Sequence, residues 1–361
     1  MKIVHFAKFY PPEYGGIESV TEALAEDHAA EGHDVEVVCF TRELPQLEQV
    51  GRLSLRRVKV QKEIASQPLA ISYLNACKAA ARNADVVHVH TPNMLAALAV
   101  LRLPRHVRLV IHWHADIENK GTLGRLVRPI ERAILRRADI IVTTTKAYAE
   151  ASSTLAGFKD RVRVVPIGIA DVARASKLEV ATPPYVLFVG RLVPYKGLNV
   201  LLDAIPLVKS NVEFHIVGTG PQLAELREQT QRLGIADRVR FLGRVEEDQL
   251  NDLMVGAAVF CLPSVNRLEA FGVVLLEAMR AGRAIISTNI PGSGVPWVNA
   301  TGLNVPVRDP RALAEGIVQL LADPEEAARL GRLARSRFEN DFSRELMSRR
   351  FLRLYHQLLN N

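Results

Sequence analysis

The stretch Val186-Leu-Phe-Val-Gly190-Arg-Leu-Val-Pro-Tyr-Lys-Gly197 places a short apolar strand before a loop that begins and ends with glycine, and a helical pattern follows it. The start of the chain has the same order: a strand near 2–7, the pair Gly15-Gly16, and a helix predicted from about 17 to 31. Short strands that alternate with helices are typical of parallel sheets joined by crossover helices. The sequence therefore predicts an α/β fold built from two similar halves.

The alternation continues along both halves. Strands are predicted near 2–7, 34–40, 85–90, 108–113, 139–144 and 162–166, and then near 185–189, 213–217, 239–242, 258–262 and 284–287. The segment 169–184 loses the alternation and ends in Thr-Pro-Pro, which indicates a linker. A chain of 361 residues also exceeds what one core usually fills, so two domains are expected.

Composition excludes several classes of protein. No apolar run reaches the eighteen or so residues that span a bilayer, and the opening strand is too short for a signal peptide, so we expect a cytoplasmic protein. The cysteines at 39, 77 and 261 are far apart in apolar or helical sequence. They predict neither a disulfide framework nor a zinc site.

The net charge of +7 reflects two basic clusters in the first half. No aromatic interleaving or nucleic-acid motif accompanies them, so we expect an anionic membrane surface rather than nucleic acid as a possible partner. The alternative is an ordinary solvated helix face whose apolar stripe packs on the domain core. The clusters comprise Arg52, Arg56, Arg57, Lys59 and Lys62, and an amphipathic helical pattern with Lys120, Arg125, Arg128, Arg132, Arg136 and Arg137 opposite Leu123, Leu126, Val127, Ile130 and Ile134.

A second informative stretch is Glu269-Ala-Phe-Gly-Val-Val-Leu-Leu-Glu277. A helix that starts near Gly272 would hold Glu277 in its second turn among apolar residues, with Glu269 in the preceding loop. A buried carboxylate needs partners, which ligand hydroxyls can supply, and the free N–H groups of the first turn favour an anion beside them. A sugar joined to a phosphate meets both demands. The alternative is that Glu269 complements the helix dipole and Glu277 pairs with a lysine or arginine.

The pattern Pro263-Ser264, Glu269, Phe271-Gly272, Glu277-Ala-Met279 and Gly282 strongly resembles the nucleotide-sugar motif of the retaining glycosyltransferases of family 4. The resemblance covers nearly the whole chain and implies the GT-B fold, with two facing Rossmann-like domains and a cleft between them. It implies an acceptor domain at 1–170, a donor domain at 171–342, and a C-terminal helix at about 343–361 that packs back on the first domain. It also implies that Glu269 holds the donor sugar and Glu277 the ribose.

Other loops gain expected roles from the same resemblance. Arg191 and Lys196 match the cations that hold the diphosphate, although a solvated basic loop is the alternative. Gly218 matches a second glycine turn and Val245 a position in the base pocket, while Gly15 and Gly16 would face the diphosphate; structural turns would explain these glycines equally well. The expected donor-binding residues are Gly15, Gly16, Arg191, Lys196, Gly218, Val245, Glu269, Phe271, Gly272, Val273 and Glu277.

The stretch Ile111-His-Trp-His-Ala-Asp116 ends a predicted strand, so alternation sends His112 and His114 to one side. Such histidines could bind a metal, but no further ligand stands at a useful spacing and an Asp-x-Asp motif is absent, so neither metal nor cofactor is expected. The resemblance assigns His114 to the reaction centre together with Arg191, Lys196 and Glu269. For His88, His90 and His112 a role in the core is the alternative.

These expectations combine into one predicted activity. The chain would be a retaining, metal-independent hexosyltransferase that moves a hexose, of mannose or rhamnose type, from a nucleoside diphosphate sugar such as GDP-mannose to a glycan or lipid-linked acceptor. The setting would be O-antigen or other lipopolysaccharide and cell-surface polysaccharide synthesis, with the protein peripheral on the inner face of the plasma membrane. The alternatives are a nucleotide-sugar epimerase of the same fold and a non-catalytic nucleotide-sugar-binding protein.

Overall fold

The computed structural model describes the chain apart from residues 14, 65–66, 118–120, 173–180, 182 and 361, and for 121–126 it describes the backbone alone. Part of the predicted linker and Lys120 thus lie outside the described residues, as do the side chains of Leu123, Arg125 and Leu126. The chain divides into two compact units, Met1–Ile169 with Arg344–Asn361, and Ala170–Ser343. Each unit is an α/β structure around its own sheet, which confirms the predicted fold class.

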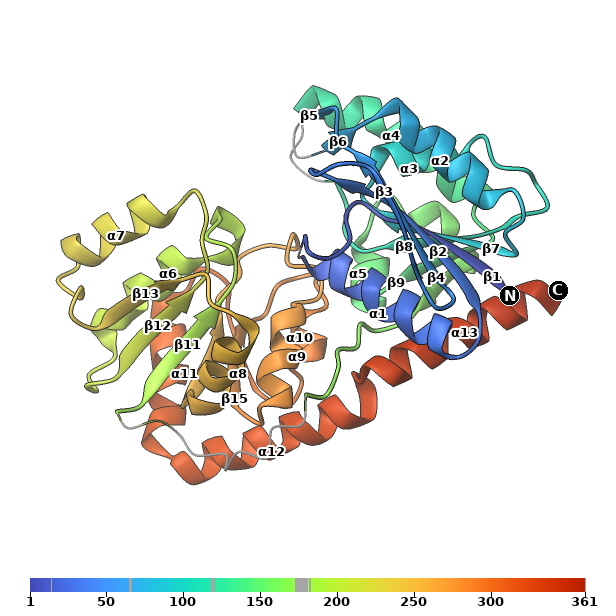
Figure 1. Cartoon of the computed structure of the whole chain (residues 1–361). Coiled ribbons are helices and arrows are strands. Elements are labelled where there is room, and N and C mark those ends of the chain that lie inside the picture. Colours follow the sequence, from blue (N-terminus) through green and yellow to red (C-terminus); the bar gives the residue numbers. More distant parts are fainter. Residues whose placement is uncertain (14, 65–66, 118–120, 173–180, 182, 361) are drawn as a thin grey trace. The chain divides into compact units, whose positions relative to one another are not determined.

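Unit 1 is organised around an eight-stranded sheet in the order β10-β9-β8-β7-β1-β2-β4-β3, in which only β3 runs antiparallel to its neighbour (Figure 1). A separate hairpin pairs β5 with β6. The strands are β1 Lys2–Phe6, β2 Asp34–Thr41, β3 Gln46–Val50, β4 Leu53–Lys59, β5 Lys62–Ile64, β6 Gln67–Leu69, β7 Val86–Thr91, β8 Arg108–Trp113, β9 Ile140–Thr143 and β10 Val162–Val164.

Helices cover the sheet of unit 1. The helices α2, α3 and α4 pack in sequence against one another, whereas α1 packs against the C-terminal helix α13. The helix α1 ends before Gly32, whose φ of +89° suits a helix C-terminus. The helices are α1 Gly16–Ala30, α2 Ile71–Ala81, α3 Met94–Val100, α4 Gly121–Arg137, α5 Lys146–Ala151 and α13 Arg344–Asn360.

The helix α13 is held in unit 1 by ion pairs to α1 and by buried apolar side chains. Arg344 donates to Asp27 and Glu26 over 2.8 and 2.9 Å, and Phe351 and Tyr355 are fully buried in the same unit. Burying two such aromatic side chains is a large apolar contribution. The last helix of the chain is therefore part of unit 1, although unit 2 precedes it in sequence.

Unit 2 has a six-stranded parallel sheet in the order β13-β12-β11-β14-β15-β16. Its core lies between the sheet and helices such as α6 and α11, with Phe188, Leu201 and Ile317 fully buried. The strands are β11 Tyr185–Val189, β12 Glu213–Val217, β13 Val239–Gly243, β14 Val259–Leu262, β15 Ala284–Thr288 and β16 Leu303–Val305. The helices are α6 Leu198–Ala204, α7 Leu223–Arg232, α8 Glu247–Gly256, α9 Val273–Arg280, α10 Val295–Val298, α11 Pro310–Ala322 and α12 Pro324–Asp341.

The eleven predicted strands are present, and five further strands, β3 to β6 and β16, were not predicted. The edge strand β3 is exposed along most of its length, and β5, β6 and β16 have three residues each. Such segments give little apolar alternation to read. The strand β4 is longer, but Arg56 and Arg57 interrupt its apolar residues. Within the described residues, no helix has both the length and the apolar character needed to cross a membrane.

Candidate functional site

The first candidate site lies where the strand order of unit 2 reverses, between β11 and β14. Open parallel sheets bind ligands at the carboxyl ends of strands at such a point. Here the loops that follow the two strands touch, because the Val265 amide donates to the Tyr195 carbonyl over 2.8 Å. Gly197, with φ of +68°, makes this approach possible, since a Cβ there would lie 2.1 Å from the Pro263 oxygen.

Lys196 and Glu269 meet at this point. Their Nζ and Oε2 atoms are 2.5 Å apart, and Ser264 Oγ donates to the same carboxylate oxygen over 2.9 Å. Lys196 is 8% and Glu269 7% exposed. Burial alone would lower the pKa of Lys196, but the Glu269 carboxylate outweighs it and the pKa is raised. Lys196 is thus a fixed, buried positive charge.

The loop that carries Glu269 is held at several backbone atoms. Ser293 Oγ donates to the Glu269 carbonyl, the Gly294 amide donates to the Ala270 carbonyl over 2.8 Å, and Thr288 Oγ1 donates to the Ser264 carbonyl. Sequence spacing does not reveal these hydroxyl contacts, because they join residues that lie far apart in the chain. They fix the position from which the Glu269 side chain reaches Lys196.

Glu277 lies in the second turn of α9, as predicted, after Gly272 with φ of +78°. The residue is half-buried, but its Oε2 atom is enclosed and has no hydrogen-bond partner among the residues that the structure describes. Burial raises the pKa of Glu277 to about 7, against the opposing charge of Arg280. The guanidinium of Arg280 is hydrogen-bonded instead to the Ala170 carbonyl and to Asn251. A ligand hydroxyl would supply the hydrogen bond that this oxygen lacks among the described residues.

Glycines bring three loops of unit 2 together, the loop that carries Lys196 and two others. A Cβ at Gly218, where φ is +129°, would lie 2.0 Å from the Gly190 oxygen. The Gly218 amide donates to the Gly243 carbonyl over 2.7 Å, next to the loop that contains Val245. Arg191 is exposed in the first of these loops. The loops after β11, β12 and β13 therefore line one edge of the sheet.

Two predicted residues of the Glu269 loop contribute apolar surface. Phe271 is 3% exposed and meets Phe342 edge-on at 6.1 Å between ring centroids. Val273 opens α9 and is half-buried. Unit 2 thus assembles Arg191, Lys196, Gly218, Val245, Glu269, Phe271, Gly272, Val273 and Glu277 around neighbouring loops, whereas Gly15, Gly16 and His114 belong to unit 1.

In unit 1, Gly15 is the N-cap of α1 and Gly16 is its first residue. Gly15 has an extended backbone, with φ of −179°, which any residue could adopt. The preceding loop is held by Arg57, whose side chain donates to the Pro11 carbonyl over 2.7 Å and pairs with Glu48 at 2.5 Å. The sequence assigns Arg57 to a basic cluster, and in the structure this arginine is largely buried and holds the glycine loop.

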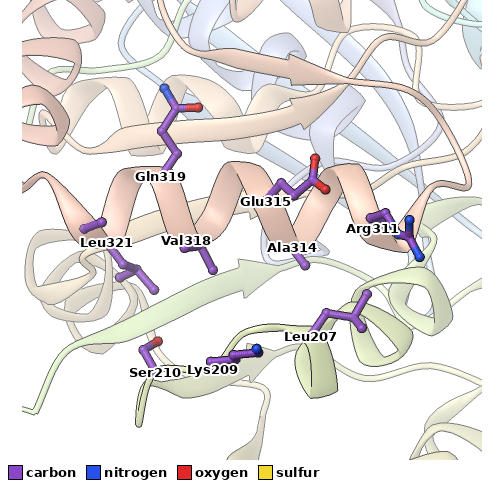
Figure 2. Close-up of a pocket in the computed structure, with 10 residues that line it drawn as sticks. Leu207, Lys209, Ser210, Arg311, Ala314, Glu315, Val318, Gln319 and Leu321 are labelled. Atoms are coloured by element: carbon purple, nitrogen blue, oxygen red, sulfur yellow. The ribbon is translucent and has the colours of Figure 1, made fainter.

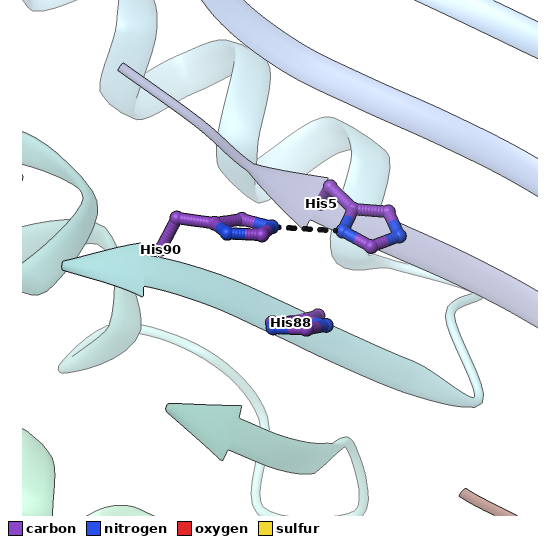
Figure 3. Close-up of side chains that lie close together, drawn as sticks. All are labelled: His5, His88 and His90. Carbon is purple, nitrogen blue, oxygen red and sulfur yellow. Dashed lines mark hydrogen bonds between the residues drawn. The ribbon is translucent and has the colours of Figure 1, made fainter. Parts of the chain in front are cut away.

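Histidines fill the centre of unit 1. His112 of β8 and His114, the first residue after that strand, lie on the same side as predicted, with ring centroids 3.8 Å apart. Strand register then sets His5 of β1 beside His88 of β7, and His90 beside His112. Figure 3 shows His5, His88 and His90, with the contact between His5 and His90.

These histidines form groups that sequence spacing did not reveal. Two sets of three histidines each bring one ring nitrogen per residue to within 4.8 Å of the other two nitrogens. The first set is His5, His88 and His90, and the second is His90, His112 and His114. The sequence analysis found no further ligand near His112 and His114, because His5 and His90 come from other strands. Burial lowers the pKa of all five, to about 3 for His5 and His114.

A cavity of about 680 Å³ lies elsewhere on unit 2, between α11 and the turn Ile205–Leu207. Figure 2 shows Ala314 and Val318 pointing from α11 toward Leu207 and Ser210, while Gln319 points away. None of the predicted site residues lines it. It is therefore separate from the loops around Lys196.

Comparisons with known families match both units. Residues 170–337 match the family model described as "Glycosyl transferases group 1", and residues 15–168 match the one described as "Glycosyl transferase 4-like domain". Among curated proteins, the O-antigen chain mannosyltransferase C of Escherichia coli is 32% identical over the full length of both chains. The D-rhamnosyltransferase WbpZ of Pseudomonas aeruginosa is 33% identical over 95% of this chain and 92% of its own length.

Solved structures share the fold at lower identity. The sucrose-phosphate synthase of Thermosynechococcus elongatus superposes with a TM-score of 0.80 at 24% identity, covering 99% of each chain. Anabaena HepE in complex with UDP and glucose gives a TM-score of 0.78 at 19% identity, covering 98% of this chain and 99% of its own. These likenesses confirm the GT-B fold class.

Proposed function

The chain belongs to the group 1 glycosyl transferases, and on that premise we propose that it is a retaining, metal-independent hexosyltransferase that uses a nucleoside diphosphate sugar. The observation that carries the proposal is the buried Lys196–Glu269 pair beside the start of α9, with Arg191 in the same loop as Lys196. The unpartnered Oε2 of Glu277 supports it, because it offers an acceptor for a ribose hydroxyl.

The charges suit a diphosphate leaving group. In the proposed reaction the bond between the sugar C1 and the diphosphate oxygen breaks, and a bond from the acceptor oxygen to C1 forms on the same face. The acceptor's proton passes to the leaving diphosphate. Negative charge grows on that group in an oxocarbenium-like transition state, so fixed cations lower the barrier. Lys196 and Arg191 would supply these cations without a metal ion.

The remaining residues would hold the donor. Glu269 would accept hydrogen bonds from sugar hydroxyls and Glu277 from the ribose, while Val245, Gly218 and the first turn of α9 would contact the nucleotide. Phe271 and Val273 would shape the apolar side of this pocket. In unit 1, His114 would contact the donor sugar, and Gly15 and Gly16 would present backbone N–H groups to the diphosphate at the start of α1.

For the sugar, we propose mannose or rhamnose, since two full-length relatives bear the names mannosyltransferase and rhamnosyltransferase. The proposal extends to a GDP carrier and to a glycan or lipid-linked acceptor of cell-surface polysaccharide. We also propose that the enzyme acts in the cytoplasm at an anionic membrane face. The exposed side chains of Arg128, Arg132 and Arg136 along α4 support that location.

A screen of nucleoside diphosphate sugars by thermal shift, followed by product analysis, tests the proposal. We expect a GDP-sugar to raise the melting temperature and its hexose to appear on a supplied acceptor. Interconversion of the free nucleotide sugar would support an epimerase instead. A donor that binds and is never transferred to any supplied acceptor would support a binding protein.

A further inference from the structure

Three of the buried histidines form a hydrogen-bonded chain across adjacent strands. His5 Nδ1 lies 3.1 Å from His90 Nε2, and His90 Nδ1 lies 3.1 Å from His114 Nε2. The exposed fraction rises along the chain from 0% at His5 through 1% at His90 to 6% at His114. The chain therefore runs from the interior of unit 1 to the residue proposed for the reaction centre.

Each contact in this chain requires one proton. A neutral imidazole has one N–H donor and one lone-pair acceptor, and burial lowers the pKa of all three rings, so they are neutral at neutral pH. Two contacts in series then leave two arrangements. Either all three protons sit on Nδ1, or all three sit on Nε2.

The far end of the chain distinguishes the two arrangements. His5 Nε2 is buried and has no partner among the described residues. A proton on this atom would be a buried donor without an acceptor, which is the rarer kind of unsatisfied group in proteins. With the protons on Nδ1, His5 donates to His90, His90 donates to His114, and the His114 Nδ1–H remains free to donate.

We propose that His90 and His5 are positioning residues that fix His114 as the Nδ1–H tautomer. In this tautomer the His114 imidazole can donate a hydrogen bond from Nδ1–H to a hydroxyl of the transferred sugar. The assignment to the sugar rests on the proposed function. The tautomer itself does not, because it follows from contacts within unit 1. Fixing the tautomer of an imidazole at a reaction centre can contribute a large factor in rate.

A metal ion is the competing use of these histidines. It would require the His90 and His114 nitrogens that already face each other at hydrogen-bond distance. Each set of three contains only imidazoles, so no carboxylate ligand from the set would offset the buried charge. The hydrogen-bonded chain uses the same atoms without that penalty.

His88 provides a matched control. It is buried on the same strand as His90, with ring centroids 4.4 Å apart, but its Nδ1 lies 2.5 Å from the hydroxyl of Tyr355 rather than in the chain. Replacing His88 should perturb the core as much as replacing His90. It should leave the proton order between His90 and His114 unchanged.

The experiment uses the full-length protein with ¹⁵N-labelled histidine. The tautomer of His114 is determined by NMR in the absence of ligand. We expect Nδ1–H in wild type and in His88→Gln, and a mixture of tautomers in His90→Gln, whose amide reaches the Nε2 position alone. His90→Asn, whose amide stands near the Nδ1 position, should restore much of the wild-type signal. Should His90→Gln fail to fold, His5→Gln tests the same hydrogen-bonded histidine chain at the contact with His90, one step further from His114.

Turnover gives the second readout. His90→Gln should lower kcat at least about tenfold with little change in KM for the donor, and His90→Asn should recover part of the loss. An Nε2–H tautomer of His114 in wild type, or wild-type tautomer and kcat in His90→Gln, would overturn the proposal. So would one equivalent of bound metal in wild type that is lost in His90→Gln. If His114→Ala kept full turnover while the tautomers behaved as expected, the proposed role of His114 in the reaction would be wrong. The proposed hydrogen-bonded order of His5, His90 and His114 would still be supported.

Discussion

The Nζ atom of Lys196 lies 2.5 Å from Oε2 of Glu269, and both side chains are buried. From the sequence, Lys196 is expected to be a cation aimed at the diphosphate and Glu269 to contact the sugar. The structure makes each the partner of the other. A donor that enters this site would share Lys196 with Glu269, so the two residues should be tested together.

Lys196→Ala should reduce stability as well as turnover. Removing one partner of a buried ion pair leaves an uncompensated charge and typically costs about 3–5 kcal/mol of unfolding free energy. The double variant Lys196→Met/Glu269→Gln should regain most of that loss without regaining turnover. Urea unfolding and initial rates measure the two effects; a loss of stability below about 1 kcal/mol in Lys196→Ala would mean that the pair contributes little to the fold.

Arg191→Ala should affect turnover alone. Its side chain is exposed, so stability should change by no more than about 0.5 kcal/mol, whereas losing one charge that stabilises the leaving group typically costs about a hundredfold in rate. Arg191→Lys is the matched control and should retain more turnover, because it keeps a positive charge. Near-normal kcat in Arg191→Ala would remove this residue from the site.

Removing metal ions with a chelator tests whether the cationic side chains of the protein are enough for transfer. We expect transfer to persist in excess EDTA, since Lys196 and Arg191 are proposed to neutralise the diphosphate without a metal ion. Rates before and after chelation, and after adding magnesium or manganese, are the measurement. Complete loss on chelation with recovery on adding metal would show that a metal ion takes part.

Glu277→Gln should change how stability depends on pH. Burial raises the pKa of Glu277 from 4.5 to about 7, so between these values the folded protein binds a proton that the unfolded chain has lost. The free energy of unfolding should therefore fall as pH rises from 4.5 to 7, by up to about 3 kcal/mol from this group. The difference between wild type and Glu277→Gln across this window isolates the effect. Parallel pH profiles would show that Glu277 titrates normally.

Replacing Arg128, Arg132 and Arg136 with glutamine should weaken binding to anionic vesicles. Each cation near such a surface contributes about 1 kcal/mol, and salt screens the attraction. Sedimentation of vesicles at low and moderate salt measures the binding, and transfer to a soluble acceptor should survive in the variant as a control for folding. Equal binding by both proteins would leave α4 as a solvated surface helix.

Sequence patterns predicted most of the fold because the strands of an α/β sheet are continuous apolar runs between turn residues. The strands β1, β8, β11 and β14 each follow this rule. The edge strand β3 does not, because it is exposed along most of its length, and it was missed. The inner strand β4 was missed as well, because Arg56 and Arg57 interrupt its apolar residues. A continuous apolar run is thus visible in the sequence in a way that an exposed or charge-interrupted strand is not.

The candidate site was only partly visible. Motifs within one loop, such as Glu269 to Glu277, can be read directly, since the helix start fixes their spacing. The Lys196–Glu269 pair depends on two strands meeting at a switch point, and the chain from His5 to His114 depends on the register of three strands. Sequence spacing carries no information on such contacts. The same limit hid the contact of Arg57 with the loop before Gly15.

The central claim, a retaining transfer from a nucleoside diphosphate sugar, is tested most directly by the anomeric configuration of the product. The wild-type enzyme would be incubated with GDP-α-mannose or the matching rhamnose donor and an acceptor, and the new linkage read by NMR. We expect an α-linked product, whose yield falls sharply in Arg191→Ala. A β-linked product, or an altered nucleotide sugar with no new glycosidic bond, would contradict it.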